Sequence, residues 1–319
     1  MRRGELIRVQ IQEQRNRMMK APNYWKNYLL KIDAGVIERN LKRTTCKSRG
    51  LNLSLKYFEK DRNASNILLI GGTGGYSLFG VEMMYEMHMR NYNVFGIDFQ
   101  GHGDSEGKRG DFTIGELVEN CSDAAKYIFT NFNDRIGAIG PSIGGFITFY
   151  LGLAHGPVKS ISCQNPAILA EKKFQGEVTK KAKGILPLAK LVATLLPKSK
   201  IPVTLYVDFK GFPETEREKE IFEKNEKDPD TVKWYTLRAA MSQILTPPPN
   251  PIGEMRIPTM FLVPNRDKLM SVSYVRDLYD RLLPTIKKKF VEVNGGHWWM
   301  LSHSKEAAQV ICDWFDETL

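Results

Sequence analysis

Paired cysteines, metal-ligand motifs and long hydrophobic runs are all missing from this 319-residue sequence. The cysteines are few and scattered, without a CxxC pair or a metal-like spacing to histidine: Cys46, Cys121, Cys163 and Cys312. We expect reduced, mostly buried thiols, because a chain of this length does not need disulfides for stability. No run of about 18 apolar residues occurs, so no transmembrane helix is predicted. The opening MRRGELIRVQIQEQRNRMMK lacks the apolar core of a secretory signal. We therefore expect a cytoplasmic protein.

The charge balance is basic, with 46 lysines and arginines against 36 acidic residues. A net charge of +10 is compatible with nucleic acid, an anionic membrane surface or an acidic substrate. No nucleic-acid motif occurs, and no aromatic residues alternate with arginines as they do in nucleic-acid-binding surfaces. We expect no nucleic-acid partner and interpret most of the excess as solvated lysines.

Short apolar runs alternate with helical stretches along much of the chain. This rhythm predicts one large α/β domain, with a mostly parallel sheet and crossover helices on both faces. A hairpin is predicted over TTCKSRGLNLSLKYFEK. The predicted strands are SNILLIGG, NVFGIDFQ, RIGAIG, VKSISCQN, PTMFLVPN and KKFVEVNGG, and the helices lie near 78–90, 113–131, 143–155, 272–283 and 304–317.

The rhythm is interrupted between VKSISCQN and PTMFLVPN. Residues 166–250 carry no such alternation and end in the proline-rich block TPPPNP, a natural return linker. We predict that 166–250 is an inserted, mainly helical cap, and that residues 41–165 and 251–319 form the core. Residues 1–40 are predicted to form a basic helical arm.

The segment GAIGPSIGG places Ser142 between glycines two residues to either side. The serine lies between a predicted strand and a predicted helix, which is the context of a G-x-S-x-G nucleophile elbow. Gly140 and Gly144 suit a turn too sharp for flanking side chains, and the following helix directs its N-terminal N–H groups toward the site. Ser142 is therefore a candidate nucleophile.

A serine needs a general base and a group that orients the base. His297 follows the last predicted strand in a glycine-rich loop, and His303 is its main competitor. Asp267 follows the preceding predicted strand, so all three candidates lie at the carboxyl edge of the sheet, where such sheets place their sites. The alternatives are a loop histidine packed on Trp298 and an ordinary helix-start carboxylate.

A tetrahedral intermediate also needs hydrogen-bond donors for its oxyanion. Ile143, the residue after the serine, supplies one backbone N–H. The loop GGTGG after the first parallel strand allows close approach of the backbone, and Thr73 is the second candidate by position.

Four stretches resemble the α/β-hydrolase superfamily, and specifically its monoacylglycerol lipase-like branch, also called serine aminopeptidase S33 or hydrolase-4. They are GGTGGYS, FGIDFQGHGDSEG, GPSIGG and the spaced Asp267 and His297, and the similarity covers residues 45–319. The resemblance implies an α/β-hydrolase fold, a Ser-His-Asp triad and hydrolysis of monoacylglycerols or related carboxylic esters. It also implies structural roles for His102, Asp104 and Ser105. Gly71 and Pro141 stand where the family has histidine, and neither change removes a candidate oxyanion donor.

Other classes of function stay open at this point. GGTGGYS followed by Asp98 has some likeness to a dinucleotide-binding segment, although Ser77 replaces the third glycine. A ligand-binding protein that kept the fold, an acyl thioesterase and an acyltransferase are further alternatives. The triad chemistry requires neither a metal nor an organic cofactor, and none is predicted.

The substrate is predicted from the composition of the insertion. Residues 171–210 contain nine lysines and three acidic residues, beside the apolar helical face of GILPLAKLVATLLP. This combination is typical of an amphipathic surface and leaves peripheral membrane contact open. We predict a lipid-ester or medium-chain acyl-ester substrate, and we expect a peptide substrate less. The oligomeric state is not predicted.

Overall fold

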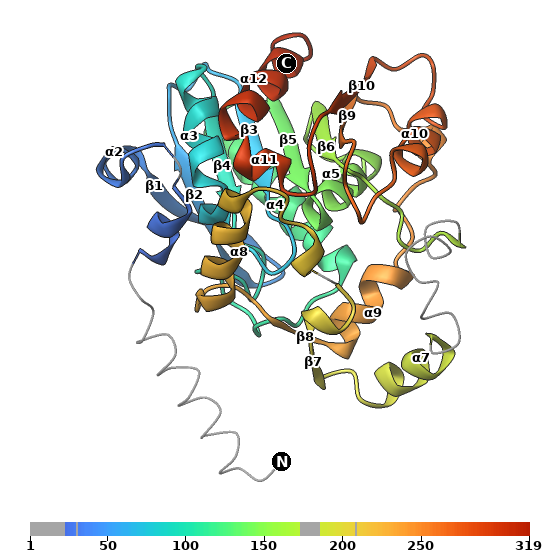
Figure 1. Ribbon diagram of the computed structural model, residues 1–319. Helices are drawn as coiled ribbons and strands as arrows, with labels where there is room; N and C mark the ends of the chain where they lie inside the picture. Colours follow the sequence, from blue (N-terminus) through green and yellow to red (C-terminus); the bar gives the residue numbers. More distant parts are fainter. Residues whose placement is uncertain (1–22, 30, 173–185, 208) are drawn as a thin grey trace.

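A sheet of eight strands forms the centre of the computed structural model, which describes residues 23–29, 31–172, 186–207 and 209–319 (Figure 1). The strand order is β1-β2-β4-β3-β5-β6-β9-β10, and every neighbouring pair is parallel except those that β2 makes with β1 and β4. The strands are β1 (Lys42–Ser48), β2 (Leu51–Phe58), β3 (Asn66–Ile70), β4 (Asn93–Ile97), β5 (Ile136–Pro141), β6 (Ser160–Gln164), β9 (Thr259–Pro264) and β10 (Lys288–Val293). Each contains residues of a predicted run or of the predicted hairpin. The central strands lie between two helix layers, which explains their continuous apolar sequences.

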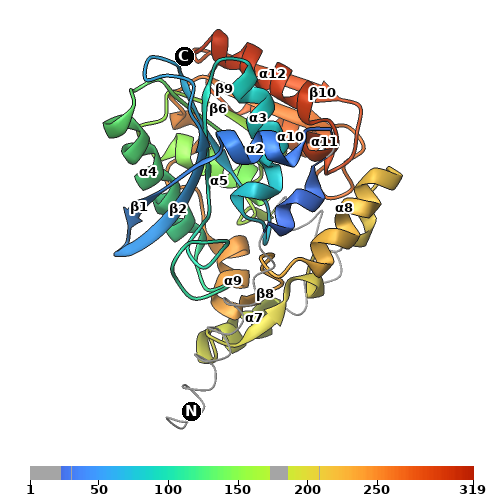
Figure 2. The same cartoon turned by 90° about the vertical axis from the view of Figure 1, so that its left-hand side faces the viewer.

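Helices cover both faces of the sheet (Figure 2). The helices of the core are α2 (Ala34–Asn40), α3 (Val81–Met89), α4 (Ile114–Asn131), α5 (Ile143–Leu153), α10 (Val272–Asp280), α11 (Trp299–Ser302) and α12 (Ser304–Asp316). Helices α4, α5 and α10 pack on one face, and α3 and α12 pack on the other. Neighbouring residues of β3 face opposite sides of the sheet, because Leu68 belongs to one apolar cluster and Leu69 to the other. The predicted fold class is confirmed.

The chain between β6 and β9 leaves the sheet. Its elements are α7 (Leu186–Leu195), β7 (Lys200–Pro202), η3 (Val203–Leu205), η4 (Phe209–Gly211), α8 (Glu216–Lys227), β8 (Trp234–Thr236), α9 (Leu237–Leu245) and η5 (Ile252–Glu254). In Figure 1, α7, β7, β8 and α9 lie low, and α8 lies higher, beside the core. The two-stranded β7–β8 sheet was not predicted, because three-residue strands are too short for a periodic signal. Lys173, Lys180, Lys181, Lys183 and Ile185 lie outside the described residues, as do 1–22 of the predicted arm.

Strand β8 and the residues before it join the insertion to the core through two glycines. Val232 N–H donates to the Gly74 carbonyl at 2.8 Å, and Thr236 N–H donates to the Gly110 carbonyl at 2.9 Å. A Cβ atom at Gly74 would lie 2.5 Å from the Val232 carbonyl oxygen, and one at Gly110 would lie 2.0 Å from that of Trp234. The close approach of the backbones therefore requires glycine at both positions.

A buried carboxylate joins helix α8 to the core and to the short helix η1 (Tyr24–Tyr28). Asp228 is fully buried and accepts hydrogen bonds from the hydroxyl groups of Tyr28, at 2.6 Å, and Tyr76, at 2.9 Å. Burial, reinforced by this carboxylate, raises the pKa of both phenols. Both tyrosines therefore stay protonated and act as donors.

The four cysteines are buried and free, as predicted. None of the helices in the described part of the chain combines the length and hydrophobicity needed to cross a lipid bilayer.

Candidate active site

Ser142 occupies the tight turn between β5 and α5. Its backbone has φ 56° and ψ −127°, a strained conformation for a residue other than glycine. A Cβ atom at Gly140 would lie 2.4 Å from the Gly144 backbone, and one at Gly144 would lie 2.3 Å from the Ile70 carbonyl oxygen. The two glycines that flank the serine are thus required by close packing of the turn.

His297 and Asp267 come together at the carboxyl ends of β10 and β9. The His297 Nδ1 atom lies 2.6 Å from Asp267 Oδ2, and both side chains are buried. The other carboxylate oxygen accepts from the N–H groups of Leu269, at 2.7 Å, and Met270, at 3.2 Å. Burial opposes ionisation of Asp267, but the hydrogen bond with His297 and these backbone donors lower its pKa below the ordinary value. The carboxylate is therefore ionised and accepts a hydrogen bond from the Nδ1–H group of His297.

The competing histidine lies elsewhere. The ring of His303 stacks on Trp299, with centroids 5.6 Å apart, and its Nδ1 atom is hydrogen-bonded to Ser302. His102 is buried, and its Nδ1 atom lies 3.0 Å from the Gln100 carbonyl oxygen. Neither contact involves Asp267.

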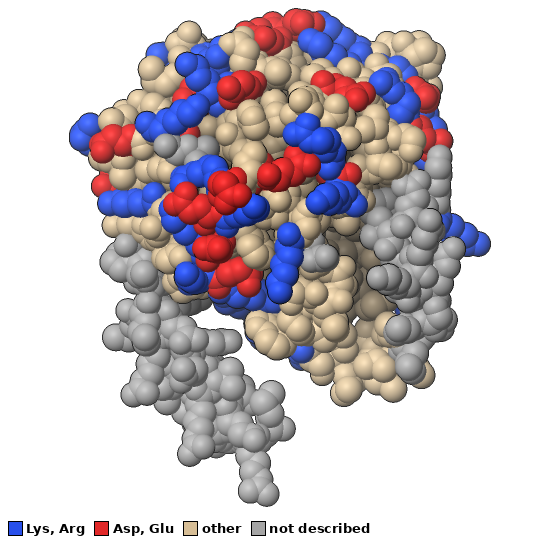
Figure 3. Space-filling view, viewed as in Figure 1, with Lys and Arg blue, Asp and Glu red and all other residues tan. Residues whose placement is uncertain are grey.

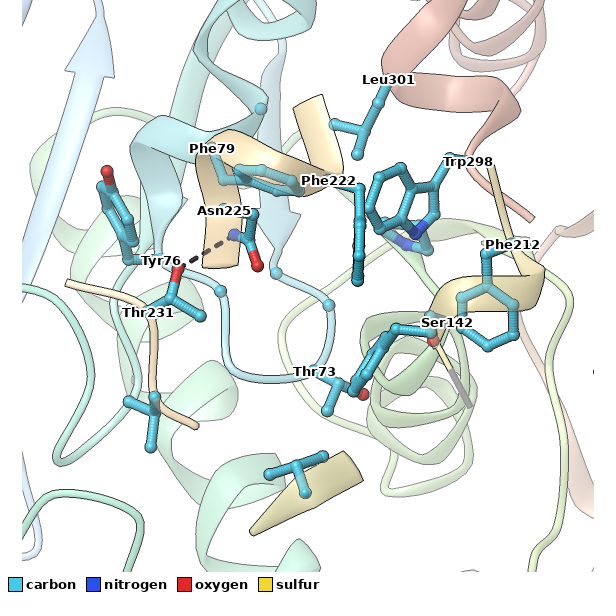
Figure 4. Close-up of a pocket in the computed structure, with 18 of the residues that line it drawn as sticks. Thr73, Tyr76, Phe79, Ser142, Phe212, Phe222, Asn225, Thr231, Trp298 and Leu301 are labelled. Carbon is cyan, nitrogen blue, oxygen red and sulfur yellow. Dashed lines mark hydrogen bonds between the residues drawn. The ribbon is translucent and has the colours of Figure 1, made fainter. Parts of the chain in front are cut away.

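Ser142 and His297 line one cavity of about 310 Å³ between the core and the insertion. In Figure 4, Ser142 lies at one end, near Thr73 and Phe212, and Asn225 and Thr231 lie away from it. Most of the other side chains that line the cavity are apolar. They include Leu69, Phe79, Met83, Val203, Phe209, Phe222, Trp298, Met300 and Leu301.

The insertion places an aromatic ring directly against the histidine. The rings of Phe212 and His297 have centroids 4.3 Å apart and planes inclined by 35°. Nearby, Glu214 forms an ion pair with Arg266, the neighbour of Asp267 in the chain, at 3.1 Å. Segment 212–214 therefore covers the imidazole and contacts the loop that carries the acid.

The loop after β3 lies beside the serine. A Cβ atom at Gly72 would be 3.9 Å from Ser142 Cβ. Gly74 N–H donates to the hydroxyl of the buried Tyr235 at 2.7 Å, and Gly75 N–H donates to the Gly72 carbonyl at 3.1 Å. Among the described residues, no group accepts the N–H of Thr73. This donor is thus available to a ligand in the cavity.

Several residues of the site escaped prediction. Asn165 donates through Nδ2 to Asp267 Oδ2, and Gln164 donates through Nε2 to the His297 carbonyl at 3.0 Å. Their position at the carboxyl end of the predicted strand VKSISCQN was an available signal. No sequence signal was available for Phe212 and Tyr235, because they reach the site from the insertion, whose path over the core the sequence does not reveal.

In a dinucleotide-binding site Asp98 would bind the ribose, but its carboxylate already has partners within the chain. Asp98 is fully buried, forms an ion pair with Lys56 and accepts from the N–H groups of Ser77, at 2.8 Å, and Asp104, at 2.9 Å. It does not line the cavity. A ribose hydroxyl would find no free carboxylate there.

Solved structures share this architecture. Monoacylglycerol lipase from Paleococcus ferrophilus is 17% identical, with a TM-score of 0.69 over 82% of this chain and 98% of that one. A soluble variant of monoglyceride lipase from Saccharomyces cerevisiae, in complex with a substrate analog, is 14% identical, with a TM-score of 0.70 over 87% and 95%. Alpha/beta hydrolase GrgF from Penicillium sp. sh18 is 15% identical, with a TM-score of 0.66 over 87% and 98%. The fold is therefore that of the α/β hydrolases.

The family can be stated more narrowly. The family model Hydrolase_4, described as serine aminopeptidase S33, matches residues 61–301, and the chain belongs to this family. No curated protein matches the sequence. The predicted resemblance is confirmed at the level of the family.

Proposed function

We propose that this protein is a serine hydrolase that cleaves carboxylic esters through an acyl-enzyme. The observation that carries the proposal is the shared cavity of Ser142 and His297, with His297 Nδ1 2.6 Å from Asp267 Oδ2. The strained backbone of Ser142 adds support, because strain at a serine between two glycines is typical of a nucleophile elbow.

The proposed reaction has two halves. Ser142 Oγ attacks the acyl carbon while His297 Nε2 takes the hydroxyl proton, and Asp267 holds the Nδ1 proton and stabilises the imidazolium. The alcohol leaves with the proton from His297, and water then repeats the sequence on the acyl-enzyme. The N–H groups of Thr73 and Ile143 stabilise the oxyanion in both halves.

The cavity supports a substrate with a medium acyl chain. Its walls are mostly aromatic and aliphatic, and its volume of about 310 Å³ suits a small to medium-sized ligand. The insertion supplies much of this wall, from Pro202 to Trp234, and we propose that it acts as a cap that sets chain-length preference. Relatives in fold include two monoacylglycerol lipases, which agrees with a lipid ester as substrate.

A panel of substrates tests this function. It contains p-nitrophenyl esters of two to sixteen carbons, a monoacylglycerol, a lysophospholipid, an acyl thioester and an aminoacyl amide. We expect the highest kcat/KM on medium-chain esters and a fall of about 10⁴-fold or more in Ser142→Ala. Preference for the thioester would support the thioesterase alternative, and preference for the amide would contradict the ester proposal.

The insertion also presents an exposed apolar patch, which we call the insertion patch. It comprises Leu191, Leu195, Leu196, Leu205, Tyr206 and Trp234, with the exposed lysines Lys190, Lys198, Lys200 and Lys210 in the same segment. Figure 3 shows few charged side chains over β7, β8 and α7. Trp234 also lines the cavity, so the patch adjoins it. We propose that the patch contacts the surface of an anionic lipid membrane that contains the substrate.

Vesicle sedimentation tests the membrane contact. We expect the protein to sediment with vesicles that contain phosphatidylglycerol, and the double variant Leu195→Ser, Leu205→Ser to stay in the supernatant. Equal sedimentation of the variant and the parent protein would contradict the proposal. Turnover of a short, water-soluble ester should be unchanged in the variant.

A further inference from the structure

We propose that Gln164 and Asn165 are positioning residues that hold the base and the acid of the site from the end of β6. The inference rests on the proposed function, because it assigns their role to the Ser142 chemistry. Asn165 donates to Asp267 Oδ2, the same oxygen that lies 2.6 Å from His297 Nδ1. Gln164 donates to the backbone carbonyl of His297 at 3.0 Å. Two consecutive side chains thus contact both the loop that carries Asp267 and the loop that carries His297.

The chemistry of the acceptors fixes the direction of both amides. An ionised carboxylate and a backbone carbonyl can only accept, so each amide must turn its NH₂ group toward the site. The amide oxygens, Gln164 Oε1 and Asn165 Oδ1, then face away. Among the described residues, only these two atoms and Ser77 Oγ are buried side-chain polar atoms without a hydrogen-bond partner. Buried polar atoms are nearly always hydrogen-bonded, so two such oxygens on consecutive residues need an explanation, and the hydrogen bonds donated by their NH₂ groups supply one.

The backbone conformation of Asn165 is also unfavourable. Its φ is 49°, in the left-handed region, which asparagine tolerates better than most residues but which still disfavours a side chain. The residue is fully buried, and its N–H donates to the Leu262 carbonyl on β9 at 3.0 Å. Strain and an unmet polar atom at one residue, in contact with a candidate catalytic carboxylate, indicate a functional constraint there.

The two contacts restrain different parts of the site, the Asp267 side chain and the backbone of the His297 loop. Without Asn165, only the histidine holds Asp267 Oδ2, while Leu269 and Met270 hold the other oxygen. Without Gln164, the His297 carbonyl loses its partner, and two glycines directly precede His297 in its loop. Neither Gln164 nor Asn165 lines the cavity, so the effect falls on the chemical step and not on substrate binding.

The test uses Asn165→Gly and Gln164→Met. Glycine keeps the left-handed backbone without strain, so any loss of activity reports the missing amide. Asn91→Gly is the matched control, because Asn91 is an exposed asparagine with φ 72° that does not line the cavity. For the parent and each variant we would measure kcat and KM on a p-nitrophenyl ester and stability in urea. We would also record the downfield proton NMR signal of the His297 Nδ1 hydrogen.

For each site variant we expect kcat to fall about tenfold with KM within about twofold, as for loss of one hydrogen bond in the chemical step. The Nδ1 proton signal should shift in Asn165→Gly and stay in place in Asn91→Gly. Unchanged kcat and an unchanged signal in a folded variant would overturn the inference. Retained activity in Ser142→Ala would instead overturn the proposed function. If Asn165→Gly does not fold, Gln164→Met decides by the same criteria.

Discussion

The buried His102 makes the stability of this protein depend on pH in a way that can be calculated. Burial lowers the pKa of His102 from its ordinary value of 6.5 to about 4. At pH 5 this imidazole is neutral in the folded chain and protonated in the unfolded chain. The unfolded state therefore binds more protons, and stability falls as the pH decreases from 6.5 toward 4.

Proton linkage gives the size of the effect. Between pH 7 and pH 5, His102 alone should lower the free energy of unfolding by about 2 kcal/mol. The ring packs near Phe112 and Tyr235, with centroids 5.5 Å and 6.2 Å away. Tyr235 accepts the Gly74 N–H of the candidate oxyanion loop, so loosening at His102 would also disturb that loop.

Urea unfolding at pH 7 and pH 5 tests this calculation. His102→Asn keeps a donor for the Gln100 carbonyl but cannot titrate, so it should lose about 2 kcal/mol less than the parent between the two pH values. His155→Asn is the control, because His155 is exposed and its left-handed backbone also suits asparagine. Equal losses in the parent and in His102→Asn would refute the reasoning.

Two further substitutions test the geometry around the serine. Tyr235→Phe leaves the buried Gly74 N–H without its acceptor, and we expect kcat on a medium-chain ester to fall about tenfold; unchanged kcat would show that this contact does not hold the loop. Gly144→Ala places a Cβ atom 2.3 Å from the Ile70 carbonyl oxygen, so urea unfolding should show a loss of about 3 kcal/mol. Gly253→Ala, where no atom lies within 4 Å, should be near neutral, and equal effects of the two glycine substitutions would contradict the packing argument.

The sheet and its helices were predictable because each strand carries its own signal. β3 and β4 are buried throughout and β5 is buried up to Gly140, and the helix that follows each of them begins within about 20 residues. A parallel strand covered by helices on both faces is mostly apolar, and a crossover helix usually connects it to the next strand. The positions of Ser142, Asp267 and His297 after parallel strands follow from the same rule, while their catalytic roles remain predictions.

The remaining parts of the site depend on contacts that the sequence does not encode locally. Phe212 and Tyr235 reach the cavity from the insertion, whose path over the core no periodicity reveals. Strands β7 and β8 are held by pairing with each other and by close approach of β8 to glycines of the core, and not by their own composition. Asn165 could be placed at the sheet edge from the sequence, but its contact with Asp267 depends on a left-handed backbone that only the folded chain defines.

Covalent labelling of Ser142 tests the central claim most directly. The purified protein would be treated with a fluorophosphonate, digested and analysed by mass spectrometry, and its ester hydrolysis measured beside that of Ser142→Ala. The account predicts one adduct, on Ser142, complete loss of activity in the labelled protein, and a fall of about 10⁴-fold or more in the variant. An unlabelled Ser142 in protein that hydrolyses esters, or near-normal hydrolysis by Ser142→Ala, would contradict it.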